Sequence, residues 1–330
     1  MSVRLLGVVA TALLAVSTQA ATAQDAGAND SAAVPNGLVL QNSVPDAQWT
    51  ASADALTLTR HKPDYRALVG DFPTGAVLAS ASDLHFNTAP GYDIDVTLHH
   101  AARTAWDLEG VFSNVDSSSA GVGPVPVGTG TPLLLFANAI APSGTSISVA
   151  DRTLLRSAEF NARRDVGEFF SVLAGFRYLE FDDNLAVNTF GGAATAQATV
   201  TANNFLAGGQ IGGDAHFAIG DRWQFSGVVK AGAYCDRASN SSNVVVAGVP
   251  FASAAATTNG AFVGQIEATA AYQINHAWSI RGGYQWMWLD GVAVAGNQMA
   301  VSNPAFNTAT VDHAATPYFH GAFLGIEFWH

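Results

Sequence analysis

The most constraining feature of this chain is a pair of long segments, residues 260–274 and 278–289, in which apolar and polar side chains alternate. Successive side chains of a β-strand point to opposite faces, so the pattern predicts two strands with one apolar and one polar face each. A short link, Asn275 to Ala277, joins them. Their apolar faces carry Phe262, Ile266, Ala268, Ala270, Tyr272 and Ile274, then Trp278, Ile280, Tyr284, Trp286 and Trp288.

The aromatic residues of these strands recur at an interval that suits a membrane. Phe262 and Tyr272 are ten positions apart, and so are Trp278 and Trp288. Ten residues of strand rise about 33 Å, which a tilt of about 40° reduces to about 25 Å, the height of the apolar band of an outer-membrane barrel with aromatic girdles at both edges. The predicted girdle is Phe262, Tyr272, Trp278, Trp286, Trp288 and Trp223. The alternative is a large soluble sheet with one face on a core.

Composition agrees with alternating lipid-facing strands. Charged residues make up 12% of the chain and the mean hydropathy is +0.20, yet no run reaches the about 18–20 apolar residues of a spanning helix. The formal net charge of −12 argues against nucleic acid as a partner. With Cys235 as the single cysteine, neither an intrachain disulfide nor a thiolate metal site can form. We expect no cofactor and no metal.

The first 48 residues are expected to lie outside the barrel. Residues 1–23 have the features of a secretory signal peptide, with Arg4, an apolar run over residues 5–16 and a cleavage site at Ala21-Thr22-Ala23. Residues 24–48 lack periodicity and predict a flexible leader, and residues 49–330 then form the barrel. We expect export to the outer membrane of a Gram-negative-type bacterium, in contact with outer-membrane lipid and the outer-membrane assembly machinery. The oligomeric state stays open.

The order of the segments predicts an all-β, single antiparallel up-and-down barrel of about ten strands, with eight to twelve compatible with the pattern. Short links alternate with long ones, as short periplasmic turns and long extracellular loops do in such barrels. Two long connections, residues 115–153 and 237–259, are rich in small residues and are expected to be mobile or self-packing. The predicted strands are residues 49–59, 92–100, 105–114, 154–164, 169–181, 204–219, 223–236, 260–274, 278–289 and 318–329.

If the apolar faces meet lipid, the polar faces line a lumen. Ten strands enclose little more than the width that side chains fill, so opposite charges there should pair and leave a plugged or narrow interior. The segment 169–181 fits least well, because Arg177 shares its face with Leu173 and Leu179. The predicted lumen residues are Asp93, Asp95, Asp107, Glu109, Glu159, Arg163, Arg177, Asp214, Lys230, Glu267 and Arg281.

Seven segments of the chain carry recognisable motifs: SADALTLTR (52–60), SVLAGFRYLEFDDNL (171–185), FLAGGQIGGDAHF (205–217), VVKAGAYCDRAS (228–239), AFVGQIEATAAYQI (261–274), WSIRGGYQWMWLDGVAVA (278–295) and HGAFLGIEFW (320–329). Together they resemble the putative beta-barrel porin-seven family of bacterial outer-membrane proteins. The resemblance spans most of the chain beyond the signal peptide and implies an outer-membrane barrel. It implies little about transport.

Candidate sites are few. No G-x-S-x-G motif occurs, and the adjacent His99 and His100 would point to opposite faces of a strand, so we expect no catalytic residues and no enzyme. The sequence EFDDN, residues 180–184, is compatible with a calcium site or with a solvated rim. The cluster Arg60-His61-Lys62 with Arg66 is compatible with contact to anionic glycolipid or with an ordinary solvated rim. The glycine pairs at 208–209 and 212–213 are interpreted as strand glycines.

The preferred interpretation is a porin-like outer-membrane protein that forms a narrow passive channel with a mild preference for cations, because acids exceed bases among the predicted lumen residues. The alternative is a closed barrel that displays long surface loops as an adhesion or structural envelope module.

Overall fold

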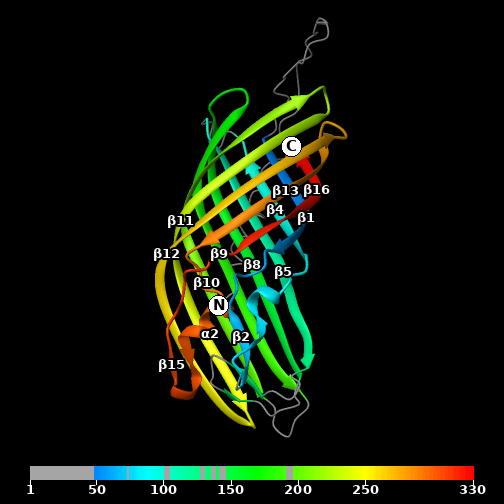
Figure 1. Cartoon of the computed structure of the whole chain (residues 1–330). Coiled ribbons are helices and arrows are strands. Elements are labelled where there is room, and N and C mark those ends of the chain that lie inside the picture. The colour runs from blue at the N-terminus through cyan, green and yellow to red at the C-terminus, as the bar shows by residue number, and fades with distance from the viewer. Residues whose placement is uncertain are drawn as a thin grey trace, which may run out of the picture. The chain divides into compact units, whose positions relative to one another are not determined.

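A closed β-barrel forms the body of the protein. The computed structural model describes residues 48–72, 74–99, 105–126, 131–134, 139–140, 146–190 and 196–330. Within these residues ten antiparallel strands close in the order β1-β16-β13-β12-β11-β10-β9-β8-β5-β4 (Figure 1). The predicted up-and-down barrel is therefore confirmed. The predicted signal peptide and nearly all of the predicted leader lie outside the described residues.

The barrel strands differ greatly in length. The strands near the chain termini have 10–13 residues, whereas β5 and β8 to β12 have 20–25. Their bounds are β1 (Trp49–Arg60), β4 (Ala89–Leu98), β5 (Asp107–Pro126), β8 (Ser146–Asp165), β9 (Phe170–Phe190), β10 (Ala196–Ile219), β11 (Trp223–Val246), β12 (Val249–Gln273), β13 (Trp278–Asp290) and β16 (Tyr318–Trp329).

Both termini of the barrel lie at the end where the short links are, which we call the terminal end. The Gln48 and Trp49 amides both donate to the His330 carbonyl there. The opposite, distal end carries the extensions of the long strands. The β11–β12 hairpin closes there through Ala247 and Gly248, both at positive φ (49° and 81°), as a tight two-residue hairpin turn requires.

The prediction of long loops was wrong for parts of three connections. Residues 237–246 and 249–259 continue β11 and β12 as paired strands, and residues 182–190 and 196–203 do the same for β9 and β10. In the connection 115–153, β5 and β8 extend to Pro126 and from Ser146. Alternation of small residues such as Ala, Ser, Thr and Val is sufficient for a strand whose backbone is fully paired, so low hydrophobic contrast did not indicate a loop.

The two faces of the long strands exchange character part-way along. On β9, Val172 and Phe176 face outward near the terminal end, at 43% and 53% exposure. Towards the distal end the outward positions are polar, such as Glu180 and Asn184, whereas inward-facing Phe181 and Leu185 are buried. Apolar side chains face out where lipid surrounds a barrel and in where water does. The terminal half of the barrel therefore carries the membrane band, which on β11 comprises residues 223–235.

The expectation that polar strand faces line the lumen was wrong for the distal half. There the lumen is filled by two connections, which we call segment A (residues 61–88) and segment B (residues 291–317). Segment A contains β2 (Ala67–Phe72), β3 (Val77–Ser80) and the 3-10 helix η1 (Ala81–Asp83); segment B contains α2 (Ala295–Val301), β14 (Ser302–Asn303), η3 (Pro304–Phe306) and β15 (Thr308–Ala309). β2 pairs with β3 and also with β6 (Thr131–Leu134), which in turn pairs with β7 (Ala139–Ile140). None of the helices in the described residues is long and apolar enough to span a membrane.

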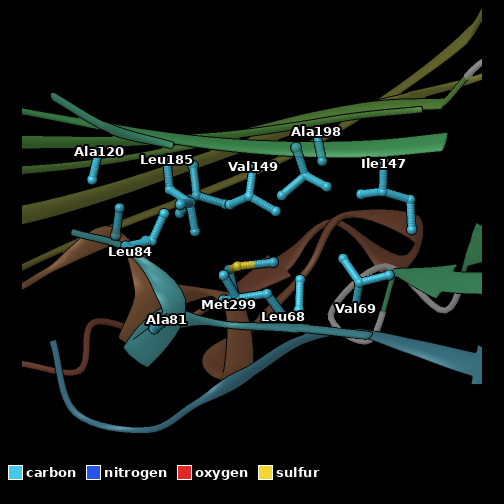
Figure 2. Packing of buried hydrophobic residues seen from close by; sticks show 14 of the residues in the cluster. Leu68, Val69, Ala81, Leu84, Ala120, Ile147, Val149, Leu185, Ala198 and Met299 are labelled. Carbon is cyan, nitrogen blue, oxygen red and sulfur yellow. The ribbon is translucent and has the colours of Figure 1, made fainter. Parts of the chain in front are cut away.

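The apolar packing of both segments explains why they enter the barrel. Figure 2 shows Leu68 and Val69 of segment A and Met299 of segment B opposite Val149 on β8 and Leu185 on β9. These five side chains are at most 3% exposed. Burying an aliphatic side chain of this size stabilises the fold by about 1.5–3 kcal/mol relative to leaving it in water. Segments rich in such residues therefore fold back into the apolar distal lumen.

Candidate functional site: the closed lumen

The predicted girdle residues lie at the two edges of the apolar band. At the terminal end Trp223 stacks edge-on against Tyr272, with ring centroids 5.0 Å apart, and Trp278 packs on Phe328 at 4.8 Å. At the other edge lie Phe262, Trp286 and Trp288. Phe262 is 39% exposed, and its neighbour Ile266 is 40% exposed. No other layer of the described chain covers this surface, which is inconsistent with a soluble sheet packed on a core.

All eleven predicted lumen residues lie on inward-facing strand positions. Glu109, Glu159, Arg177, Asp214 and Lys230 are buried, and Asp93, Asp95, Asp107, Arg163, Glu267 and Arg281 are half-buried. Strand 169–181, which fitted the pattern least well, places Arg177, Leu173 and Leu179 on the same inner face. For Leu179 the physical reason is the change of lumen polarity along β9, because apolar side chains belong on the inner face beyond Arg177. Leu173 lies on the terminal side of Arg177, opposite Arg163 of β8.

A polar layer crosses the lumen inside the membrane band. Lys230 Nζ on β11 lies 2.8 Å from Glu159 Oε2 on β8, and Arg177 Nη1 on β9 lies 3.3 Å from Glu159 Oε1. Arg177 also donates to Gln265 Oε1 on β12 at 2.9 Å. Arg177 and Glu159 lie opposite each other on neighbouring strands. Two strands separate Lys230 from Glu159, and two separate Arg177 from Gln265, so these two contacts pass through the interior. Glu159 thus neutralises two buried cations at the centre of the layer.

Other ion pairs flank this layer. Arg163 bridges Glu109 and Asp214, at 2.5 and 2.9 Å. On the opposite wall Arg281 lies between three carboxylates, those of Asp54, Glu267 and Glu327, at 3.5–4.0 Å. Asp107 pairs with His99 near the terminal mouth, at 3.0 Å. The predicted pairing of opposite charges inside the lumen therefore occurs, in this case between neighbouring or next-neighbouring strands of the wall.

A second layer, distal to the first, was not predicted. Arg60 Nη1 on β1 lies 2.5 Å from Asp183 Oδ1 on β9 and donates to Thr153 on β8 at 2.7 Å. In the ring of ten strands β1 and β9 are separated by three strands on one side and five on the other, so this contact spans the lumen. Arg60 is 3% exposed and Asp183 is fully buried.

Aromatic rings and segment B seal this second layer. The Arg60 guanidinium lies 4.6 Å from the ring of Phe86, in segment A, and 5.7 Å from that of Phe181, on β9. Asp183 Oδ2 accepts a hydrogen bond from the Ala295 amide of segment B at 2.8 Å. The sequence signal for Arg60 was its period-two phase with Leu56 and Leu58, which are also inward-facing.

Inward-facing amides fix segment B to the wall. Asn204 on β10 exchanges two hydrogen bonds with the backbone of Ala293, at 2.7 and 2.8 Å. Asn240 on β11 donates to Ser302 Oγ and to the Thr310 carbonyl, at 2.8 and 3.0 Å. Both amides are at most 1% exposed. A buried polar group that finds such partners holds a segment in one position, because leaving the group unpaired is costly.

The structure does not bring together the residues of two candidate sites, the calcium site and the glycolipid-binding cluster. In EFDDN, Glu180 and Asp182 face outward while Asp183 faces inward, so the three carboxylates do not converge; within the described residues no group of three His, Cys, Asp or Glu could hold a metal ion. The basic cluster is divided as well. Arg60 enters the lumen, His61 lies beside Tyr318, and Arg66 lines a cavity of about 450 Å³ between the two segments.

One carboxylate pair in the membrane band is unfavourable. Asp93 lies directly opposite Asp54 in the β1–β4 register, and within the described residues Asp93 has neither an ion pair nor a hydrogen bond. Like charges at opposed cross-strand positions are destabilising. We expect Asp93→Asn to raise the free energy of unfolding by about 0.5–1 kcal/mol, measured by urea titration in detergent micelles. The exposed Asp165→Asn is the control and should change nothing; a loss of stability in Asp93→Asn would contradict the repulsion.

Comparison with known families decides the assignment. A family model described as Putative beta barrel porin-7 matches residues 124–324. The chain belongs to this family. The resemblance expected from the sequence motifs is thereby confirmed, and the porin-7 family and the barrel together place the chain among porin-like outer-membrane β-barrels. No curated protein matches the chain.

Several solved structures are similar in fold to this porin-7 family member. The outer membrane protease OmpT from Escherichia coli is 8% identical, with a TM-score of 0.50 over 88% of this chain and 100% of that chain. The translocator domain of the autotransporter NalP from Neisseria meningitidis (8%, 0.36, 86% and 88%) and the toluene transporter TbuX from Ralstonia pickettii (10%, 0.32, 87% and 91%) are also similar. At this identity the likeness to OmpT shows the fold alone.

Proposed function

We propose that this porin-like outer-membrane protein is a closed barrel at rest. Its role would be structural: the barrel holds the distal ends of its long strands at the cell surface, where they can contact a partner. The observation that carries the proposal is the contact of Arg60 with Asp183 across the lumen, beneath Phe86 and segment B. A hydrated ion would have to displace this buried pair to pass. The terminal end would then face the periplasm and the distal end the exterior.

The distal half of the barrel suits a surface module. Beyond the membrane band its outward positions on β9 to β11 include Asn184, Asn188, Thr201, Asn203 and Asn243, which are polar and carry no charge. Such a surface is stable in water and presents many hydrogen-bonding groups to a partner outside the cell. The absence of a catalytic role belongs to this proposal, since the activity of OmpT does not extend to this chain on fold similarity alone.

The test is the conductance of the purified full chain in planar bilayers. We expect no channel events at any voltage from a preparation that shows heat-modifiable migration on a denaturing gel, which reports an intact barrel. A preparation of the intact barrel that conducts steadily would overturn the closed state.

A second candidate is the narrow passive channel with a mild cation preference. It is supported by the terminal half of the lumen, where nine acids (Asp54, Asp93, Asp95, Asp107, Glu109, Glu159, Asp214, Glu267 and Glu327) face four bases (Arg163, Arg177, Lys230 and Arg281). If openings occur, their reversal potential in a potassium chloride gradient should lie on the cation side. An anion-side potential would contradict this candidate.

A further inference from the structure

One buried carboxyl in the distal lumen lacks a side-chain partner in the described structure. Asp236, on the inner face of β11 just beyond the membrane band, is fully buried. Neither of its carboxylate oxygens has a hydrogen bond of normal geometry within the described residues, and the Phe205 backbone amide is the one hydrogen-bond donor that acts on it. Nearly all buried polar groups in folded proteins are hydrogen-bonded, and an ionised carboxylate without a partner is among the most costly groups to bury. The position therefore requires a physical explanation.

Asp236 lies beneath segment B. The inward-facing residues on either side of it pack against that segment: Tyr234 belongs to the cluster that contains Val292 and Val294, and Ala238 belongs to the cluster that contains Ala293. The wall at Asp236 is thus the surface on which segment B sits. Any change of charge at this carboxyl acts directly on that contact.

The residue opposite Asp236 also has an unused acceptor. Asn259 on β12 is its register partner, so the two Cβ atoms are about 4.5–5.5 Å apart on the same face. Asn259 donates from Nδ2 to the Gly291 carbonyl, where segment B begins, at 2.7 Å, and its Oδ1 has no partner in the described structure. An ionised Asp236 and the Asn259 carbonyl are both acceptors only. A proton on Asp236 would provide the missing donor.

We propose that protonation of Asp236 seats segment B: the protonated carboxyl donates to Asn259 Oδ1 and keeps the segment closed, and its ionisation loosens the segment. Asn259 connects the proton to the segment because its other side-chain atom already holds Gly291. Segment B would therefore be bound more tightly to the barrel wall in acid than at neutral pH. The inference rests on the proposed closed state, in which segment B fills the lumen, and adds a dependence of that state on pH.

The charged surroundings agree with this direction. Burial raises the pKa of Asp236 from 3.8 to about 6, and the nearby Phe205 backbone and the His313 side chain lower it by less. His313 lies in segment B and is the titratable group that acts on Asp236; the flanking Leu206 on β10 and Asn259 on β12 have no titratable side chain. Because the pKa is raised in the closed state, the contribution to closure is complete below about pH 4. It is lost as the pH rises through 6.

Hydrogen exchange of segment B tests the proposal in the intact barrel. The Ala293 and Ala295 amides are suitable reporters, since they bond to Asn204 and Asp183 rather than to Asp236. After correction for intrinsic exchange, we expect their protection to fall about tenfold between pH 5 and pH 7.5 in the wild type, from a pKa of about 6 in the closed state and 3.8 in the open state. Equal protection at both values would overturn the proposal.

Two variants locate the proton. Asp236→Asn supplies a permanent donor to Asn259, so its protection should be high at both pH values. His313→Gln should retain the response, and if it abolishes the response while Asp236→Asn does not, the proposal is wrong. Should Asp236→Asn fail to fold, the wild-type profile still decides. A wild-type barrel that conducts at both pH values would refute the closed state itself, whereas a silent barrel with flat protection would refute only the role of Asp236.

Discussion

Replacing Arg60 by Ala is expected to lower the free energy of unfolding by about 3–5 kcal/mol, the usual cost of breaking a buried ion pair. The variant leaves Asp183 and Asp151 buried at 0% and 3% exposure without their cation. It also removes the guanidinium that lies between Phe86 and Phe181. Urea or guanidinium titration of the folded barrel in micelles, followed by heat-modifiable migration and tryptophan fluorescence, measures the change.

Two controls separate the lumen pair from a general effect of losing an arginine. Arg152→Ala removes an exposed, outward-facing arginine on β8 and should change the stability by less than about 0.5 kcal/mol. The double variant Arg60→Met with Asp183→Asn removes both charges and should recover most of the loss. If Arg60→Ala costs no more than Arg152→Ala, Arg60 does not hold the lumen closed.

Glu159→Ala is expected to destabilise the barrel by a similar amount, about 3–5 kcal/mol. Its carboxylate lies within ion-pair distance of both Lys230 and Arg177, and Gln210 donates to it as well, at 2.8 Å. Without Glu159 two cations would face each other across the interior of the membrane band. The same titration measures the loss, and Glu168→Ala, at an exposed position in the β8–β9 link, is the matched control.

A double-mutant cycle gives this prediction its sharpest form. Lys230→Met should cost less in the background of Glu159→Ala than in the wild type, because the cation it removes is already unpaired there. The coupling should exceed about 1 kcal/mol for partners in direct contact. Strictly additive losses would mean that the two side chains are stabilised by other groups.

The sequence predicted the terminal half of the barrel much better than the distal half. In the membrane band each face has one solvent, so period-two alternation assigned residues such as Ile266, Lys230 and Arg281 to the correct side. On β9 the surroundings change from lipid to water outside and from polar to apolar inside. Leu179 and Arg177 therefore share a face. Local alternation cannot explain this, because it does not show which surroundings each part of the strand has in the folded barrel.

The lumen closure could not be predicted for a related reason. Segment A and segment B have no regular hydrophobic period. Their apolar residues are buried only because they pack against distant strands of the barrel, as Met299 does against β8 and β9 in Figure 2. Arg60 was grouped with its basic neighbours His61 and Lys62 along the chain. Its partner, Asp183, is 123 residues away, a pairing that a single sequence does not reveal.

The position of the two segments in the chain has a consequence for biogenesis. Segment A follows β1 directly and segment B directly precedes β16, and β1 and β16 are the strands whose pairing completes the ring. The two strands of the seam are therefore directly connected to the segments that fill the lumen. We expect the pairing of β1 with β16 and the filling of the lumen to occur together, late in folding. A chain that stalls before β16 would then expose the apolar inner wall of the distal half.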